Sequence, residues 1–119
     1  MKDLLMIAMG GAVGSLGRYG LTVLASLLSL RPEWATFAAN ACGSFLIGLG
    51  LSAAARSEWS LFYTVGLCGG FTTFSTFSSQ AMRLLHDGQW LCGGLYILGS
   101  VIISLAMVWC GWQCRRMVG

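Results

Sequence analysis

Residues 66–80 are the part of this chain in which residue types and spacing point most directly to chemistry. The segment reads GLCGGFTTFSTFSSQ and combines three glycines, six hydroxyl side chains and three phenylalanines. It lies in an uncharged run between Glu58 and Arg83. In a bilayer an unpaired backbone N–H or C=O is costly, so irregular backbone persists only where protein buries it, where it lines a polar path or where it binds an ion. The segment therefore predicts a site for a polar species within the membrane.

The phenylalanines of this segment recur every three residues, and Phe74 and Phe77 should stack along one helical face. Such a stripe is usually core packing or a lipid-facing surface. Here it alternates with hydroxyl residues, including Ser75 and Thr76. Because the edge of a phenyl ring is electropositive, ring edges beside hydroxyl donors can hold a small anion without a buried cation.

Three more polar side chains and one cation fall within apolar segments. The Asn40 amide offers two N–H donors, which could serve a site or simply bond a neighbouring helix. Thr36 lies one turn earlier on the same face, and Tyr96 adds a phenolic donor from a later segment. Arg18, the one clearly intramembrane cation, should face protein or water rather than lipid.

The elements that must position these residues are predicted to be membrane helices. The chain is 56% hydrophobic and 9% charged, with a mean hydropathy of +0.75, and its 119 residues make one domain, 1–119. Three uncharged segments meet the length of about 20 residues that a spanning helix needs. They lie at 34–55, 59–82 and 88–114. A fourth apolar region, Leu4 to Leu30, is predicted to form one tilted or broken first helix.

The predicted fold is therefore an all-α membrane protein of four transmembrane helices. Short loops are expected at 31–33, 56–60 and 86–89. Gly69 and Gly70 precede hydroxyl and β-branched residues of poor helix propensity, so the third helix is expected to break there and free backbone carbonyls. Small residues at four-residue spacing should let the helices approach closely. These residues are Gly10, Gly14, Ser44, Gly48, Ser52, Gly66 and Gly70.

The orientation signal of the chain is weak. A signal peptide is an alternative reading of the N-terminus, but Asp3 weakens its positive region, and we expect the first helix to be retained. Four helices then place both termini on one side, with Lys2, Arg56, Arg115 and Arg116 against Arg31 and Arg83 on the other. A bias of four basic residues against two favours neither orientation strongly, so inversely oriented copies could build an antiparallel dimer.

Several functional classes are disfavoured by what the sequence lacks. The acidic residues lie at span ends and the single histidine in a loop, so a proton-driven exporter of similar size is disfavoured. The sequence contains no nucleophile with a base partner and no phosphate-binding loop, which argues against an enzyme or an ATP-driven pump. The net charge of +3 needs no nucleic-acid partner, because the basic residues lie where lipid phosphates would meet them. The five cysteines, without a C-x-x-C pair, are expected to act as small packing residues.

These residues resemble the Fluc/CrcB family of fluoride channels. The likeness covers nearly the whole chain: GGAVG at 10–14 with Arg18, Asn40 with Gly43, and GLCGGFTTFSTFS at 66–78. The last of these motifs is highly specific. The resemblance implies a multi-pass protein of the bacterial plasma (inner) membrane and an antiparallel, dual-topology homodimer with two fluoride pores. It also implies a structural Na⁺ at the dimer axis, held by backbone carbonyls from the breaks in the third helices.

Carried onto matching positions, the resemblance assigns roles to individual residues. Asn40 would be the pore amide, Phe74 and Phe77 would meet fluoride, and Ser75 and Thr76 would belong to a hydroxyl track. Gly69 and Thr72 would offer carbonyls to Na⁺. Thr36 and Tyr96 match less distinctive pore positions. Gln80 departs from relatives that have a glutamate there, which puts any tuning of ion entry by that acid in doubt.

The sequence as a whole predicts a passive channel that exports cytoplasmic fluoride down its electrochemical gradient and so gives fluoride resistance. Fluoride is small and strongly hydrated, so its pore must replace water with close donors and still let the ion leave. A central Na⁺ would lower the cost of bringing anions into a medium of low dielectric. The alternatives are a small four-helix exporter of another solute and a non-transporting membrane subunit.

Overall fold

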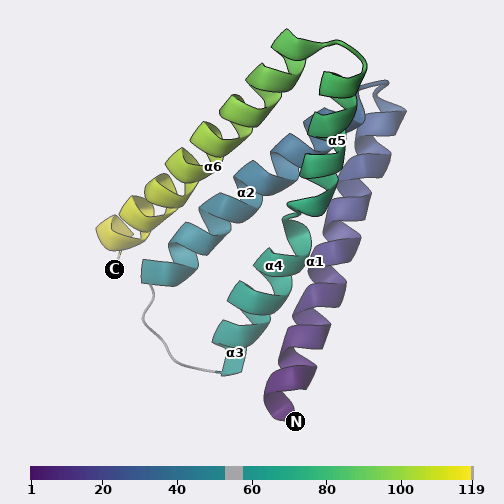
Figure 1. The fold of residues 1–119 in the computed structure, drawn as a ribbon. Helices are drawn as coiled ribbons and strands as arrows, with labels where there is room; N and C mark the ends of the chain where they lie inside the picture. Colours follow the sequence, from purple (N-terminus) through teal and green to yellow (C-terminus); the bar gives the residue numbers. More distant parts are fainter. Residues whose placement is uncertain (53–57, 119) are drawn as a thin grey trace.

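The computed structural model describes residues 1–52 and 58–118, which form helices joined by short turns (Figure 1). The predicted all-helical fold is thus confirmed for this part of the chain. In chain order the elements are α1 (Lys2–Leu27), α2 (Pro32–Ser52), α3 (Glu58–Ser60), the π-helix η1 (Leu61–Cys68), α4 (Gly69–Phe71), α5 (Ser75–His86) and α6 (Trp90–Val118).

The first and last long helices, α1 and α6, are long and apolar enough to cross a membrane by length and composition. The 26 residues of α1 correspond to about 39 Å at the usual rise of an α-helix, which exceeds a hydrocarbon core of about 30 Å. α1 runs without interruption through Arg18, so of the two predicted forms of the first helix the broken one is wrong. Only 11% of the most apolar stretch of each helix is buried within the chain, so most of its apolar surface faces outward.

The turns between helices fall close to the predicted loops. α5 ends at His86 and α6 begins at Trp90, with Gly88 at a positive φ of 79°, which glycine adopts without strain. The loop predicted at 31–33 is displaced, because α1 ends at Leu27 and α2 already begins at Pro32. A proline suits the first position of a helix, where its missing N–H has no helical partner. The structure does not describe residues 53–57, so Arg56 and Ser57 of the loop predicted at 56–60 lie outside the described residues, and Glu58–Ser60 is helical.

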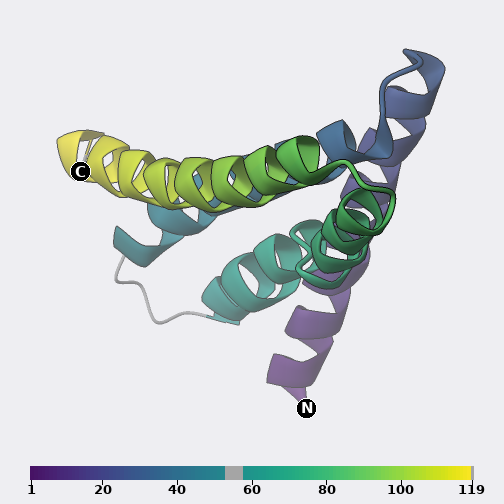
Figure 2. The same cartoon turned by 45° about the horizontal axis from the view of Figure 1, so that its top comes forward.

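The helices pack as two pairs, and glycines lie at the interface within each pair (Figures 1 and 2). α2 lies along α6, and α1 lies along η1 and α4. A Cβ on Gly48 of α2 would collide with Val108 O of α6, and one on Gly111 would collide with Phe45 O. In the other pair, a Cβ on Gly66 would lie 2.8 Å from Gly10 Cα. The prediction that small residues permit close helix approach is confirmed at Gly10, Gly48 and Gly66, whereas Gly111 was not predicted.

Both termini lie at the end of the molecule where α2 ends and α3 begins (Figure 1). The α1–α2 and α5–α6 turns lie at the opposite end. The chain runs from one end of the molecule to the other through α3, η1, α4 and α5, and this path is not a continuous helix. α4 ends at Phe71, Thr72 is extended with φ −85° and ψ 157°, and α5 begins at Ser75. This irregular stretch, residues 72–74, positions the candidate site.

Candidate functional site

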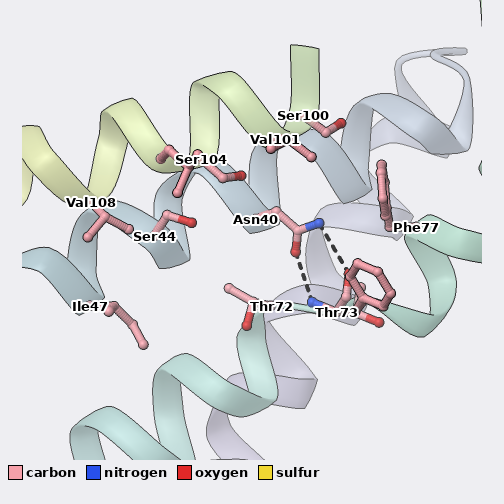
Figure 3. A pocket seen from close by; sticks show the side chains of 12 residues that line it. Asn40, Ser44, Ile47, Thr72, Thr73, Phe77, Ser100, Val101, Ser104 and Val108 are labelled. Atoms are coloured by element: carbon pink, nitrogen blue, oxygen red, sulfur yellow. Dashed lines mark hydrogen bonds between the residues drawn. The ribbon is translucent and has the colours of Figure 1, made fainter. Parts of the chain in front are cut away.

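The side chain of Asn40 pairs with the backbone of the irregular stretch. Its Nδ2 donates to Thr73 O over 3.1 Å, and its Oδ1 accepts from Thr73 N over 2.8 Å. One amide from α2 therefore satisfies both polar backbone groups of Thr73 at a point where the helix has ended (Figure 3). Because unpaired backbone groups are costly in an apolar medium, this pairing stabilises the interruption.

The start of α5 is held by hydroxyl groups. Thr73 Oγ1 accepts from Thr76 N over 3.2 Å, in the manner of a helix cap, and lies 3.4 Å from Ser75 Oγ. Ser79 Oγ donates to Thr76 O over 3.0 Å. Ser75 is exposed and Thr76 is half-buried, and neither lines the cavity described next.

A cavity of about 440 Å³ opens beside Asn40 (Figure 3). It lies between α2, the irregular stretch, the start of α5 and α6. Four of the site residues predicted from the sequence line it: Asn40, Thr72, Phe74 and Phe77. The neighbouring hydroxyl residue Thr73, which was not predicted as a site residue, lines it too. Phe74 is 78% exposed, whereas Phe77 is 8% exposed. The two rings lie 5.7 Å apart between centroids and are inclined by 51°.

Two hydroxyl residues of α6 that were not predicted from the sequence, Ser100 and Ser104, also line the cavity. Ser100 is buried, and its Oγ has no hydrogen-bond partner among the described residues. Tyr96, Ser100 and Ser104 are spaced by four residues and share one face of a helix, and this spacing could have identified them. Ser44 of α2, predicted only as a packing residue, also lines the cavity.

Tyr96 lies behind Phe77 rather than on the wall of this cavity. The centroids of the two rings are 5.2 Å apart, and Tyr96 OH donates to Gln80 Oε1 over 2.8 Å. This bond ties α6 to α5 through Gln80. Thr36, on the same side of α2 as Asn40, is buried at 5% exposure and does not line the cavity.

Arg18 contacts protein, as the sequence analysis expected for an intramembrane cation. Its Nε donates to Gly70 O over 3.3 Å in a partly buried position. Gly70 belongs to the last turn of α4, where carbonyl oxygens lack helical donors and carry partial negative charge. The guanidinium group of α1 therefore stabilises the end of α4 just before the irregular stretch.

Two other carbonyls near the interruption have lost the donors that a continuous helix would supply. Thr73 N, four residues beyond Gly69, donates instead to Asn40. Thr76 N, four residues beyond Thr72, donates instead to Thr73 Oγ1. The carbonyl oxygens of Gly69 and Thr72 are thereby released from the helical pattern, and neutral oxygen ligands of this kind suit a hard monovalent cation.

Comparison with known proteins agrees with this reading of the sequence. Residues 5–112 match the family of CrcB-like proteins, described as Camphor Resistance (CrcB). The chain is 43% identical over 114 residues to the fluoride-specific ion channel FluC of Paramagnetospirillum magneticum, with 89% of each chain covered. It is 42% identical over 124 residues to FluC of Geobacter sulfurreducens, covering 99% of this chain and all of the relative. FluC of Thermus thermophilus is 42% identical over 118 residues, covering 95% and 94%.

These relatives are named as ion channels and not as enzymes, in agreement with the predicted class. The matches extend through α1, the Asn40 region, the irregular stretch and α6. The predicted resemblance is thus confirmed over most of the chain: this protein belongs to the CrcB/FluC family of fluoride ion channels.

Proposed function

We propose that this chain is a passive, fluoride-selective channel of the bacterial inner membrane that crosses the bilayer four times and lets cytoplasmic fluoride leave down its electrochemical gradient. The observation that carries the proposal is the pairing of Asn40 with Thr73 at the edge of a cavity rich in hydroxyls and phenyl rings. The pairing uses one proton of Asn40 Nδ2. The second proton remains available as a donor for an anion in the cavity.

The cavity has the donors that a dehydrated fluoride ion needs. Ser100 and Ser104 supply hydroxyls from α6, and the edges of Phe74 and Phe77 supply weak positive potential. None of these groups carries a full charge, so an ion can be bound and still released, as conduction requires. We propose that the interruption at 72–74 is the functional break of the third transmembrane helix, with Ser75 and Thr76 beside the ion path.

The exposure of Phe74 supports a homodimer, and the weak charge bias of the chain allows that dimer to be antiparallel and of dual topology. A phenyl ring that lines the candidate path but is 78% exposed needs a further surface to cover it. A second, inverted copy would supply that surface, and the two-fold symmetry of the dimer would generate two equivalent pores. The released carbonyls of Gly69 and Thr72 fit a structural Na⁺ at the centre of such a dimer, where the ion would stabilise two converging half-helix ends.

Fluoride efflux from liposomes containing the purified protein tests this function. Loaded vesicles are diluted into fluoride-free buffer, an ionophore removes the membrane potential, and a fluoride electrode records release. We expect rapid release of fluoride and little release of chloride from matched vesicles. Release of another solute with no fluoride flux would favour an exporter of that solute, and absence of any flux would favour a non-transporting subunit.

A further inference from the structure

A second cavity, of about 360 Å³, lies at the end of the molecule that holds the α1–α2 and α5–α6 turns. Its wall is mainly apolar, with Trp34, Phe37 and Leu95 among the lining residues. Two lining side chains are charged, Arg31 from the turn and Glu33 from the start of α2. Tyr96 also lines it, and the ring of Tyr96 contacts Phe77, which lines the larger cavity. The contact between the rings of Tyr96 and Phe77 therefore separates the two cavities.

Arg31 and Glu33 form a close pair of opposite charges. Arg31 Nε lies 3.5 Å from Glu33 Oε2, and Arg31 Nη2 reaches Gln89 Oε1 of the α5–α6 turn over 3.5 Å. The arginine side chain is 55% exposed and that of the glutamate is 20% exposed. Glu33 Oε2 is itself covered and accepts no hydrogen bond from the described residues. Arg31 therefore forms an ion pair with this carboxylate oxygen that no hydrogen bond from the described residues supplements.

The pair lines the second cavity together with Tyr96, on the opposite side of the Tyr96–Phe77 ring contact from the larger cavity. An anion that approached the larger cavity from this end would therefore pass Arg31 and Glu33. Charges in a cleft with apolar walls act more strongly than on an open surface, because the low dielectric focuses their field. As long as the pair is intact, its opposite charges largely cancel, and the cavity neither repels nor traps a small anion.

We propose that Arg31 and Glu33 form a balanced charge pair at the mouth of the conduction path and set the rate at which anions enter it. Glu33 offsets the attraction that Arg31 alone would exert, and Arg31 offsets the repulsion of Glu33. This inference rests on the proposed function, because it assigns both residues to the entry of the ion that the channel conducts.

Charge-neutralising variants separate this role from a structural one. In fluoride efflux at low ionic strength and low fluoride concentration, Glu33→Gln should raise the initial rate about threefold or more, because Arg31 then concentrates anions unopposed. Arg31→Gln should lower the rate by a similar factor. The double variant should return near the parent rate, because it restores neutrality. All three differences should shrink at high concentrations of an impermeant salt, which screens charges near the surface.

Asp87→Asn is the matched control. Asp87 is exposed in the α5–α6 turn and does not line the cavity, so its replacement makes the same change in net charge at the same end of the molecule. A Glu33→Gln rate equal to that of Asp87→Asn would overturn the proposal. A lower rate in Glu33→Gln that persists in high salt would also overturn it, because that result would mean that Glu33 only stabilises the fold. Absence of fluoride flux in the parent protein would instead contradict the proposed function itself.

Discussion

The side chain of Asn40 and the peptide groups of Thr73 satisfy each other, with hydrogen bonds of 3.1 Å and 2.8 Å in opposite directions. The sequence left two readings of this amide, a site residue or a bond to a neighbouring helix. The structure shows a bond to the irregular stretch between α4 and α5, and it leaves one Nδ2 proton free for a site role. Asn40 can therefore stabilise the irregular stretch and still offer a donor to an anion in the cavity.

Replacing Asn40 tests both roles. Asn40→Asp keeps the acceptor for Thr73 N but places a carboxylate oxygen against Thr73 O and adds a charge that repels fluoride. Asn40→Ala leaves both groups of Thr73 unpaired, and an unpaired buried group costs about 1–3 kcal/mol. We expect both variants to lose most fluoride flux and to unfold at lower temperature, measured by efflux and thermal unfolding in detergent.

Thr22→Ala is the control for Asn40, because Thr22 Oγ1 makes an exposed bond to Arg18 O within its own helix. Its removal should leave flux and unfolding temperature close to those of the parent. Near-normal efflux from a folded Asn40→Asp protein would argue strongly against a role for Asn40 in the pore.

The two phenylalanines should respond differently to the same substitution. Isoleucine keeps apolar bulk but lacks the polarised ring edge, so Phe74→Ile and Phe77→Ile should both reduce fluoride flux. Phe77 is buried and contacts Tyr96, so its replacement should also lower the unfolding temperature. Phe74 is largely exposed, so its replacement should leave the stability of the single chain nearly unchanged. If both variants conduct like the parent, the rings are packing residues and not part of the ion path.

A glycine of α1 should tolerate no side chain where α1 meets the end of α4. A Cβ on Gly14 would collide with Leu67 O and lie 2.7 Å from Phe71 N, so Gly14→Ala must push α1 away from η1 and α4. We expect a marked loss of folded protein and of flux. Gly20→Ala in the same helix is the control, since nothing lies within 4 Å of its added Cβ. There the better helix propensity of alanine should hold or raise stability, by up to about 1 kcal/mol. Equal unfolding temperatures for the two variants would contradict this packing.

The sequence predicted the chemistry of the site better than its geometry. Residue types alone identified Asn40 and the segment 66–80, because an amide and a dense run of hydroxyl residues are rare within apolar segments. The partner of Asn40 could not be predicted, because it is the backbone of Thr73 and every residue has the same backbone groups. Ser100 and Ser104 were missed because two isolated serines resemble packing residues until Tyr96 is placed on the same helical face. The π-helical form of η1 has no signal in the sequence that we could identify.

Helix packing was predictable only in part. The spacing of Gly10, Gly14, Gly66 and Gly70 predicted close contacts, and the structure pairs these residues between α1 and the η1–α4 segment. Spacing does not say which helices meet. The contact of Gly48 with α6 depends on Gly111, whose lone position gave no repeat to detect.

Removal of Na⁺ should weaken the protein if the carbonyls of Gly69 and Thr72 hold this ion in the dimer. Both oxygens have lost their helical donors, so without a cation they would face each other across the dimer axis with partial negative charge. We expect a lower unfolding temperature and lower flux after prolonged exchange into a large organic cation, with recovery when Na⁺ is returned. Exchange into K⁺ is the control for ionic strength. Unchanged unfolding and flux after exchange, with removal of Na⁺ verified by elemental analysis, would remove the ion from the proposal.

The orientation of the chain in the membrane should respond to a few added charges. Basic residues number four on one predicted side and two on the other, and such a difference does not fix a single orientation. Adding two lysines beside Lys2 should orient nearly all copies one way and leave few antiparallel dimers. Cells that express this variant alone should then lose fluoride resistance. A variant with extra lysines near Arg31 and Arg83 should be oriented the other way and be equally inactive alone.

Coexpression of the two oppositely biased variants is the decisive experiment. Each supplies the inverted partner that the other lacks, so fluoride resistance should return to the level given by the parent protein. Labelling of a single cysteine introduced at the C-terminus, in a background without the five native cysteines, reports the orientation of every variant. The parent should be labelled from both sides of the membrane and each biased variant from one. Labelling of the parent from one side only, together with full resistance from either biased variant alone, would contradict the antiparallel dimer, because a uniformly oriented population contains no inverted partner.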